Sequence, residues 1–348
     1  MKMLTHFRKK LAIYTSAITL GVSVALVSGP AAAQETFTWK VQSHYPSSSV
    51  SYQDSLVRLK NVLEERTDGR LKLKLYESGA LFKARETFKA VSRGILEMGT
   101  INASYAQDSM SLAAIAAGLP FAFQNVWEAV YFHESLGFEQ MLRDEAAEHG
   151  VYWATEKAYP TEIVIKEPIN SLDDFTRLKI RSTGSLQRFL SEAGAAASYV
   201  SGSELYTALD SGVLDGAHWG AAQGAASMGL YEVAKYHVKP SLTVAGTDAF
   251  IVNQKALDKL PEDMQRIVKQ ALKESFWVRT NEYLYQERVA LAKAIAEDGV
   301  KINTLPDDVQ ERLVKTAKRM WKEEGKRSER TQEALDLLNS YLADLGYL

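Results

Sequence analysis

Two rings with versatile chemistry stand side by side in the short stretch Leu214–Trp219, which reads LDGAHW. Its Asp-Gly pair predicts a turn, because glycine tolerates a positive φ and aspartate hydrogen-bonds its own backbone. His218 and Trp219 follow that turn directly. A histidine can exchange a proton or hold a metal, and a tryptophan can pack a planar or apolar group. The pair could therefore close a core, hold a metal or face a ligand.

Arg181 ends a segment, LKIR, that otherwise has the pattern of a buried strand. A buried charge is costly without a partner, so this arginine needs negative charge beside it. Its planar guanidinium can bind a carboxylate through two parallel hydrogen bonds. An internal salt bridge and a bound ligand are both open as partners. The small and hydroxyl-bearing residues of RSTGS favour the ligand, because they let it approach the backbone.

Catalytic and cofactor motifs with a recognised mechanism are absent from the sequence. It contains no G-x-S-x-G, H-E-x-x-H, G-x-x-x-x-G-K-[ST] or strand-following G-x-G-x-x-G pattern. Cysteine is also absent, which excludes disulfides, thiolate metal sites, a cysteine nucleophile and a lipid-modified N-terminal cysteine. The histidines after residue 33 lack the spacing of zinc ligands. We therefore expect no enzyme activity, no metal ligands and no cofactor.

The first 33 residues have the order of a secretory signal peptide. Met1–Lys10 is basic, the following residues are mostly apolar, and Ser28–Ala33 consists of small residues and a proline. We expect cleavage after Ala33, with an uncleaved membrane anchor as the alternative. The composition, 46% hydrophobic and 24% charged, is that of a soluble globular protein. Acidic and basic residues are interspersed, which gives no indication of nucleic-acid binding.

The elements that position these residues alternate between strands and helices. Residues 36–43, 52–66 and 71–76 predict a strand, a helix and a strand, which form a βαβ unit. We therefore expect an α/β fold with a largely parallel sheet. In the last third, residues 263–298 predict a long helix that braces two lobes. Residues 307–330 predict a charged, amphipathic outer helix.

Two internal similarities indicate that one structural unit occurs twice. Glu86–Glu97 (ETFKAVSRGILE) resembles Glu204–Asp215 (ELYTALDSGVLD), and Trp39–Ser43 (WKVQS) resembles Leu178–Ser182 (LKIRS). A chance match of helix, glycine and strand is the alternative. Two similar lobes would bury a small molecule between them, because ligands of open α/β sheets bind beyond the carboxyl ends of the strands. The alignment predicts that the turn before His218 lies at this cleft.

Longer segments resemble the solute-binding proteins of TRAP (tripartite ATP-independent periplasmic) transporters, the DctP-like family. In the second half these segments are SLDDFTRLKIRSTGS, SGSELYTALDSGVLDGAHW and YEVAKY; in the first half they are EERTDGRLKLKLYESGAL and GLPFAF. The similarity covers nearly all of the chain after residue 33. It implies a two-lobe periplasmic binding protein with α/β lobes, a ligand cleft between them and a long bracing C-terminal helix. It also implies a carboxylate ligand held by Arg181.

Within that family, Trp219 and the upstream Pro160–Glu162 (PTE) are similar to the branch that binds 2-oxo acids, lactate and related monocarboxylates. In that branch an acidic residue usually precedes the tryptophan and helps to hold a metal ion that bridges the substrate. This chain has His218 there, and a neutral imidazole is a poor ligand for Na⁺ or Ca²⁺. His218 therefore argues against a bound cation. Lys166 replaces the arginine that sialic acid binders carry before PI, which argues against sialic acid.

We expect the protein to capture a small organic carboxylate outside the cytoplasm and to deliver it to a TRAP permease driven by an ion gradient. Arg181 would clamp the carboxylate, Trp219 would seal the cleft and His218 would hydrogen-bond the ligand. An unperturbed histidine has a pKa of about 6.5, so affinity for the anion should rise as the pH falls toward about 6. The other candidate ligand-binding residues are Tyr105, Glu162, Thr161, His44 and Tyr45.

The expected division of the chain has three parts. Residues 1–33 are the signal peptide, residues 34–158 with 246–284 form the first lobe, and residues 159–245 with 285–348 form the second. We expect a periplasmic monomer whose partners are the carboxylate and the TRAP permease subunits.

Two other hypotheses remain open. The first is an exported enzyme that acts on a small carboxylate with His218 and Glu162 as an acid–base pair, although no nucleophile or metal set accompanies that pair. The second is a sensory or structural binding module that works without a transporter.

Overall fold

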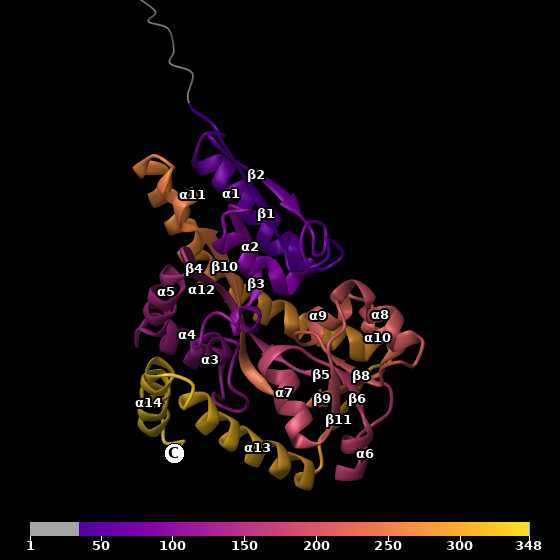
Figure 1. Ribbon diagram of the computed structural model, residues 1–348. Helices are drawn as coiled ribbons and strands as arrows, with labels where there is room; N and C mark the ends of the chain where they lie inside the picture. Colours follow the sequence, from indigo (N-terminus) through magenta and orange to yellow (C-terminus); the bar gives the residue numbers. More distant parts are fainter. Residues whose placement is uncertain (1–34, 348) are drawn as a thin grey trace, which may run out of the picture. The chain divides into compact units, whose positions relative to one another are not determined.

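The computed structural model describes residues 35–347, so the predicted signal peptide at residues 1–33 lies outside the described residues. The described chain folds into two β-sheets with helices on their faces (Figure 1). This confirms the predicted α/β class. Within residues 35–347, no helix combines the length and the apolar character needed to cross a membrane.

The first sheet has the strand order β2-β1-β3-β10-β4. Its strands are β1 (Phe37–Gln42), β2 (Leu71–Tyr76), β3 (Met98–Asn102), β4 (Val151–Thr161) and β10 (Thr243–Asn253). One face packs against α1 (Arg58–Arg66), α11 (Gln254–Asp258) and the first part of α12 (Glu262–Glu297). The other face packs against α2 (Thr87–Ser92), α3 (Ala113–Ala116), α4 (Val126–Glu134), α5 (Phe138–Glu148) and α14 (Glu329–Asp344). Three short helical turns, η1 (Tyr52–Val57), η2 (Ala84–Glu86) and η3 (Ala103–Ala106), complete this part.

The second sheet has the strand order β11-β9-β5-β8-β6-β7. Its strands are β5 (Ile163–Ile165), β6 (Lys179–Arg181), β7 (Ala196–Ser198), β8 (Gly216–His218), β9 (Tyr236–Lys239) and β11 (Lys301–Thr304). One core contains α6 (Leu172–Arg177), α7 (Gly184–Ala193) and α13 (Asp307–Gly325). The other contains α8 (Gly202–Asp210), α9 (Ala222–Ser227), α10 (Leu230–Val233) and the end of α12. The long α12 therefore contributes to the cores of both sheets, as predicted for a brace.

Both sheets are mixed, which corrects the prediction of a largely parallel sheet. β1 pairs in parallel with β2 and β3, but β10 runs antiparallel to β3 and to β4. In the second sheet, β5 runs antiparallel to both of its neighbours, β8 and β9. The reason is the path of the chain. β4 leads directly into β5 of the second sheet and β9 leads directly back into β10, so the neighbouring strands β4 and β10 carry the chain out and back in opposite directions.

Strand register confirms the two internal similarities. β1 lies beside β3 with Val41 opposite Met98, and β6 lies beside β8 with Ile180 opposite Gly216. These are the residues that the two alignments match, 41 with 180 and 98 with 216. The same unit is therefore built twice, and Arg181 ends its strand at the position that Gln42 occupies in the first sheet.

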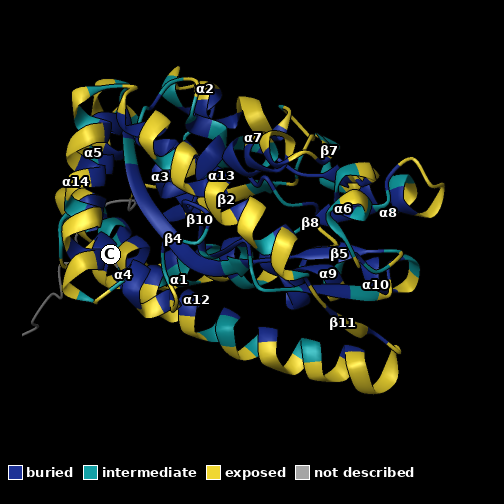
Figure 2. Ribbon diagram, turned by 90° about the horizontal axis from the view of Figure 1, so that it is seen from below, coloured by how far each residue is buried: buried dark blue, intermediate teal, exposed yellow. Residues whose placement is uncertain are grey.

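The last two helices join different cores. Val309, Leu313 and Met320 of α13 lie in the core of the second sheet. Leu338 and Leu342 of α14, however, lie in the core of the first sheet. Buried residues concentrate in the strands between the helices, whereas α12, α13 and α14 each expose one side (Figure 2). The amphipathic helix predicted over residues 307–330 is thus mainly α13, and α14 follows it on the other sheet.

Candidate functional site

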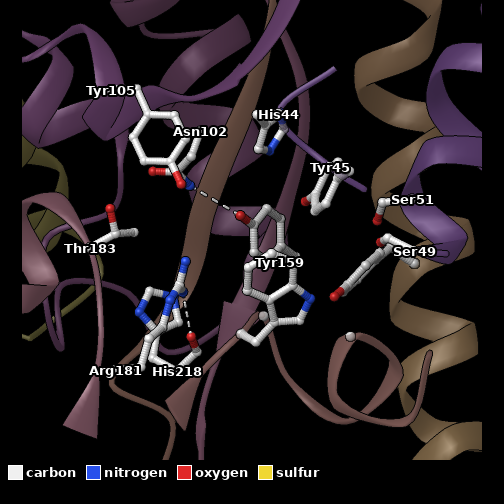
Figure 3. A pocket seen from close by; sticks show the side chains of 14 residues that line it. His44, Tyr45, Ser49, Ser51, Asn102, Tyr105, Tyr159, Arg181, Thr183 and His218 are labelled. Atoms are coloured by element: carbon white, nitrogen blue, oxygen red, sulfur yellow. Dashed lines mark hydrogen bonds between the residues drawn. The ribbon is translucent and has the colours of Figure 1, made fainter. Parts of the chain in front are cut away.

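A cavity is lined by residues from both sheets and from α12 (Figure 3). Most of its walls follow the carboxyl ends of β1, β3, β6 and β8, where ligands of open α/β sheets bind. The predicted candidates Arg181, Trp219, His218, Tyr105, His44 and Tyr45 all line it. The other lining residues are Ser49, Ser51, Asn102, Tyr159, Thr183, Gly220, Gly224 and Tyr283.

Arg181 presents a buried positive charge to this cavity, with 2% of its surface exposed. Its Nε donates to the carbonyl of Val200 at 3.0 Å, and its Nη1 donates to the carbonyl of His218 at 2.7 Å. Burial lowers the pKa of Arg181, although the Tyr105 hydroxyl beside it acts in the opposite direction. Among the described residues no carboxylate pairs with this guanidinium. The two carbonyl bonds hold the group in place and leave its Nη2 for another partner.

His218 is buried and neutral. Its Nδ1 is hydrogen-bonded to the Ser182 hydroxyl at 2.9 Å. Burial and the neighbouring Arg181 lower the pKa of His218 to about 3. The expectation that His218 titrates near neutral pH and strengthens anion binding toward pH 6 is therefore wrong for this environment. The imidazole can still donate or accept one hydrogen bond in the cavity.

Trp219 packs against the core of the second sheet and also lines the cavity. The guanidinium carbon of Arg181 lies 4.8 Å from the centre of its ring, a cation–π contact. Tyr45 meets the ring edge-on from the first sheet, with 6.2 Å between centroids. A methyl group at Gly202 would lie 2.3 Å from the indole, so only glycine leaves room for it there. Trp219 is therefore fixed between the core and the cavity.

The wall formed by the first sheet is organised around the fully buried Asp248. Lys157 donates to its carboxylate at 2.6 Å, the Tyr159 hydroxyl donates at 2.9 Å, and the Tyr45 hydroxyl donates at 2.5 Å. Burial opposes ionisation, but the neighbouring Lys157 and His44 keep the pKa of Asp248 well below its usual range. Asp248 is thus satisfied within the protein and holds the two tyrosine rings in the cavity wall.

The model of the family of bacterial extracellular solute-binding proteins, family 7, matches residues 42–327. The chain belongs to this family. The resemblance to TRAP solute-binding proteins is therefore confirmed, and the function class of the chain is solute binding outside the cytoplasm.

Individual relatives of this family 7 protein are distant in sequence and similar in fold. It is 25% identical over 260 residues to a monocarboxylate 2-oxoacid-binding periplasmic protein of Nostoc sp., with 74% of this chain and 71% of the relative covered. It is 26% identical over 294 residues to a sialic acid-binding periplasmic protein of Vibrio cholerae, with 82% and 88% covered. A TRAP periplasmic solute-binding protein from Colwellia psychrerythraea, solved with bound calcium and pyruvate, superposes with a TM-score of 0.83 at 23% identity. That match covers 89% of this chain and 95% of the relative.

Two predicted site residues of the family 7 protein, Thr161 and Glu162, do not line this cavity. They lie at the connection from β4 to β5, where the Glu162 carboxylate accepts hydrogen bonds from His237, Lys239 and Ser241. Burial opposes ionisation, but the hydrogen bond from His237 and the charge of Lys239 lower the pKa of Glu162 to about 2. Glu162 therefore joins the two segments that connect the sheets. It does not form the acid–base pair with His218 that the enzyme hypothesis needs.

Several residues of the cavity wall were not predicted from the sequence. Asn102 and Tyr159 line the cavity, and Lys157 and Asp248 support it from behind. One signal was available: a lysine and an aspartate inside the otherwise strand-like segments around 151–161 and 243–253. Their side chains meet because β4 and β10 pair with Lys157 opposite Asp248.

Replacing His218 by glutamine should remove a pH dependence of stability. The folded protein keeps His218 neutral down to about pH 3, whereas the unfolded chain binds a proton near pH 6.5. Relative to the variant, wild type should therefore lose up to about 1.4 kcal/mol of stability per pH unit below about pH 6.5, and nothing above it. Urea unfolding of both proteins between about pH 7 and pH 5 measures this difference. A constant difference across that range would contradict a neutral, buried His218.

Proposed function

We propose that the protein captures a small organic carboxylate in this cavity, outside the cytoplasm, and delivers it to a TRAP-type membrane permease. The observation that carries the proposal is the buried Arg181 guanidinium, which faces the cavity without a carboxylate partner among the described residues. A charge in this position gains most from an anion that can take two parallel hydrogen bonds. The names of the Nostoc and Vibrio relatives, both carboxylate-binding periplasmic proteins, support the same class of ligand.

The other walls favour a small ligand with a planar or apolar body. Trp219, Tyr45 and Tyr105 present aromatic surface to the cavity. Thr183 and the two serines of the lining offer hydroxyl groups for the remaining polar atoms of the ligand. Arg181 would fix the carboxylate end and the rings would cover the rest.

The lining does not fit a resident cation of the kind that the Colwellia relative holds. Na⁺ and Ca²⁺ prefer several oxygen ligands, with carboxylates among them for Ca²⁺. The lining residues include no aspartate or glutamate, and Asp248, the buried carboxylate behind Tyr45 and Tyr159, is engaged by Lys157 and these two tyrosines. Within residues 35–347, no three histidine, aspartate or glutamate side chains are grouped as metal ligands. We therefore expect direct binding of the carboxylate by Arg181.

Delivery to a permease rests on the family and on the TRAP origin of the structural relative. Cleavage after Ala33 and a monomeric state remain predictions. The sensory alternative differs from the proposal only in the partner, and no described feature favours it.

A binding screen tests the proposed function. Pyruvate, succinate, benzoate and sialic acid, each with and without chelator, are added to the purified protein and its Tm is measured. A ligand at about 100 times its Kd adds about 2.7 kcal/mol of stability, which should raise the Tm by several degrees. At least one carboxylate should do so, and chelation should leave the shift intact. Loss of the Tm shift on chelation would indicate that a cation bridges the ligand and the protein. Conversion of the bound acid to a product would favour the enzyme hypothesis.

Arg181→Ala should weaken binding of the acid found in that screen by about 30-fold or more, because truncating one partner of a buried charge pair costs about 2–5 kcal/mol. Arg181→Lys should also bind poorly, since an ammonium group cannot make the two-pronged contact. Titration calorimetry measures both variants. Arg93→Ala, which removes an exposed arginine after α2, is the matched control. Wild-type affinity in Arg181→Ala would contradict the proposed clamp.

A further inference from the structure

Arg85 extends from the part of the chain built on the first sheet to the part built on the second. It belongs to η2, just before α2. Its Nη2 donates to the Thr183 hydroxyl at 3.1 Å and to the Gln187 side-chain oxygen at 3.4 Å. Its guanidinium carbon lies 3.7 Å from the centre of the Tyr199 ring. All three partners belong to the segment that contains β6, α7 and β7 of the second sheet.

The base of Arg85 is held firmly in the first lobe. Gln42, buried at the end of β1, accepts hydrogen bonds from the Leu81 and Phe82 amides and donates to the Phe82 carbonyl. Ala84 of the same turn is buried. The backbone before Arg85 is therefore fixed, so a contact made by its side chain constrains the two lobes relative to each other.

The two lobes also meet closely beside these contacts. A methyl group at Gly184, the first residue of α7, would lie 2.2 Å from the Ser104 side chain in η3. Gly184 has a φ of +56°, a conformation that glycine adopts at little cost. Arg85 therefore crosses between the lobes where their backbones are already in contact.

The side chain of Arg85 crosses between the lobes close to Arg181, the residue proposed to bind the carboxylate. Thr183, its hydrogen-bond partner, lines the cavity. The Tyr199 ring lies near both guanidiniums, 3.7 Å from that of Arg85 and 5.8 Å from that of Arg181. Burial is the main cause that lowers the pKa of Arg181, and the positive charge of Arg85 acts in the same direction. In this arrangement both cations lie beside the Tyr199 ring, and an anion on Arg181 would offset their repulsion.

We infer that Arg85 is an interlobe latch, which holds the cavity closed through Thr183, Gln187 and Tyr199 when an anion occupies Arg181. The anion part of this inference rests on the proposed function. Arg85 acts through its contacts between the two lobes, which hold the cavity closed around the ligand.

The absence of cysteine from the chain permits a direct measurement of closure. Spin labels are attached at Lys72→Cys in β2 and Asp173→Cys in α6, both exposed. Double electron–electron resonance then gives the ratio of closed to open molecules, without ligand and with pyruvate or another acid of the screen. Arg85→Ala should lower this ratio about tenfold in the sample where wild type is most closed, because it loses a charge-assisted contact. Arg85→Lys should also lower it, since lysine cannot both stack on Tyr199 and bond two acceptors. The control Arg93→Ala should match wild type.

Two results would overturn the latch: equal ratios in wild type and Arg85→Ala in every sample, or a wild type without any closed molecules. A ratio that falls in Arg85→Ala but not in Arg85→Lys would also overturn it, because charge alone would then suffice. Failure of the proposed function is recognised separately. In that case no acid of the screen changes the Tm of wild type, while the ligand-free samples still compare closure with and without Arg85.

Discussion

A guanidinium in a protein interior has lost its water, and the loss costs several kcal/mol unless other groups replace it. Arg181 recovers part of this through the carbonyls of Val200 and His218 and through the face of Trp219. These groups are dipoles and a ring, so the net positive charge remains. The neighbouring His218 is kept neutral by the same burial and by the same charge. The second lobe therefore presents a fixed cation whose compensation by an anion is the main source of binding in our account.

The first lobe contains a buried negative charge, and groups of the same lobe neutralise it. Asp248 is as deeply buried as Arg181, yet Lys157 and the hydroxyls of Tyr45 and Tyr159 satisfy it. Its charge is not available to a ligand, and its effect is to hold two aromatic rings in the cavity wall. One lobe thus selects for charge and the other shapes the space around the rest of the ligand. Arg85 joins the two parts at the point where the charge is recognised.

Local patterns in the sequence predicted much of this arrangement. Periodicity gave the strands and helices of the βαβ unit, and the two internal similarities matched residues that strand register later aligned. Arg181, His218 and Trp219 were found because a charge or a ring next to a turn is unusual at the end of a buried strand. The predictions that were wrong or missing concern residues whose partners lie far away in the sequence. Glu162 is bound by residues more than 70 positions away, and the antiparallel pairing that joins Lys157 to Asp248 leaves no local pattern.

The central claim is that Arg181 receives the carboxylate of the ligand directly. A crystal structure of the protein with the acid that gives the largest thermal shift tests this claim. We expect a carboxylate oxygen at about 2.7–2.9 Å from an Arg181 Nη, with Trp219 and Tyr45 against the body of the ligand and no cation between them. A carboxylate bound elsewhere, or held on a metal ion while Arg181 contacts only the carbonyls of Val200 and His218, would contradict the account.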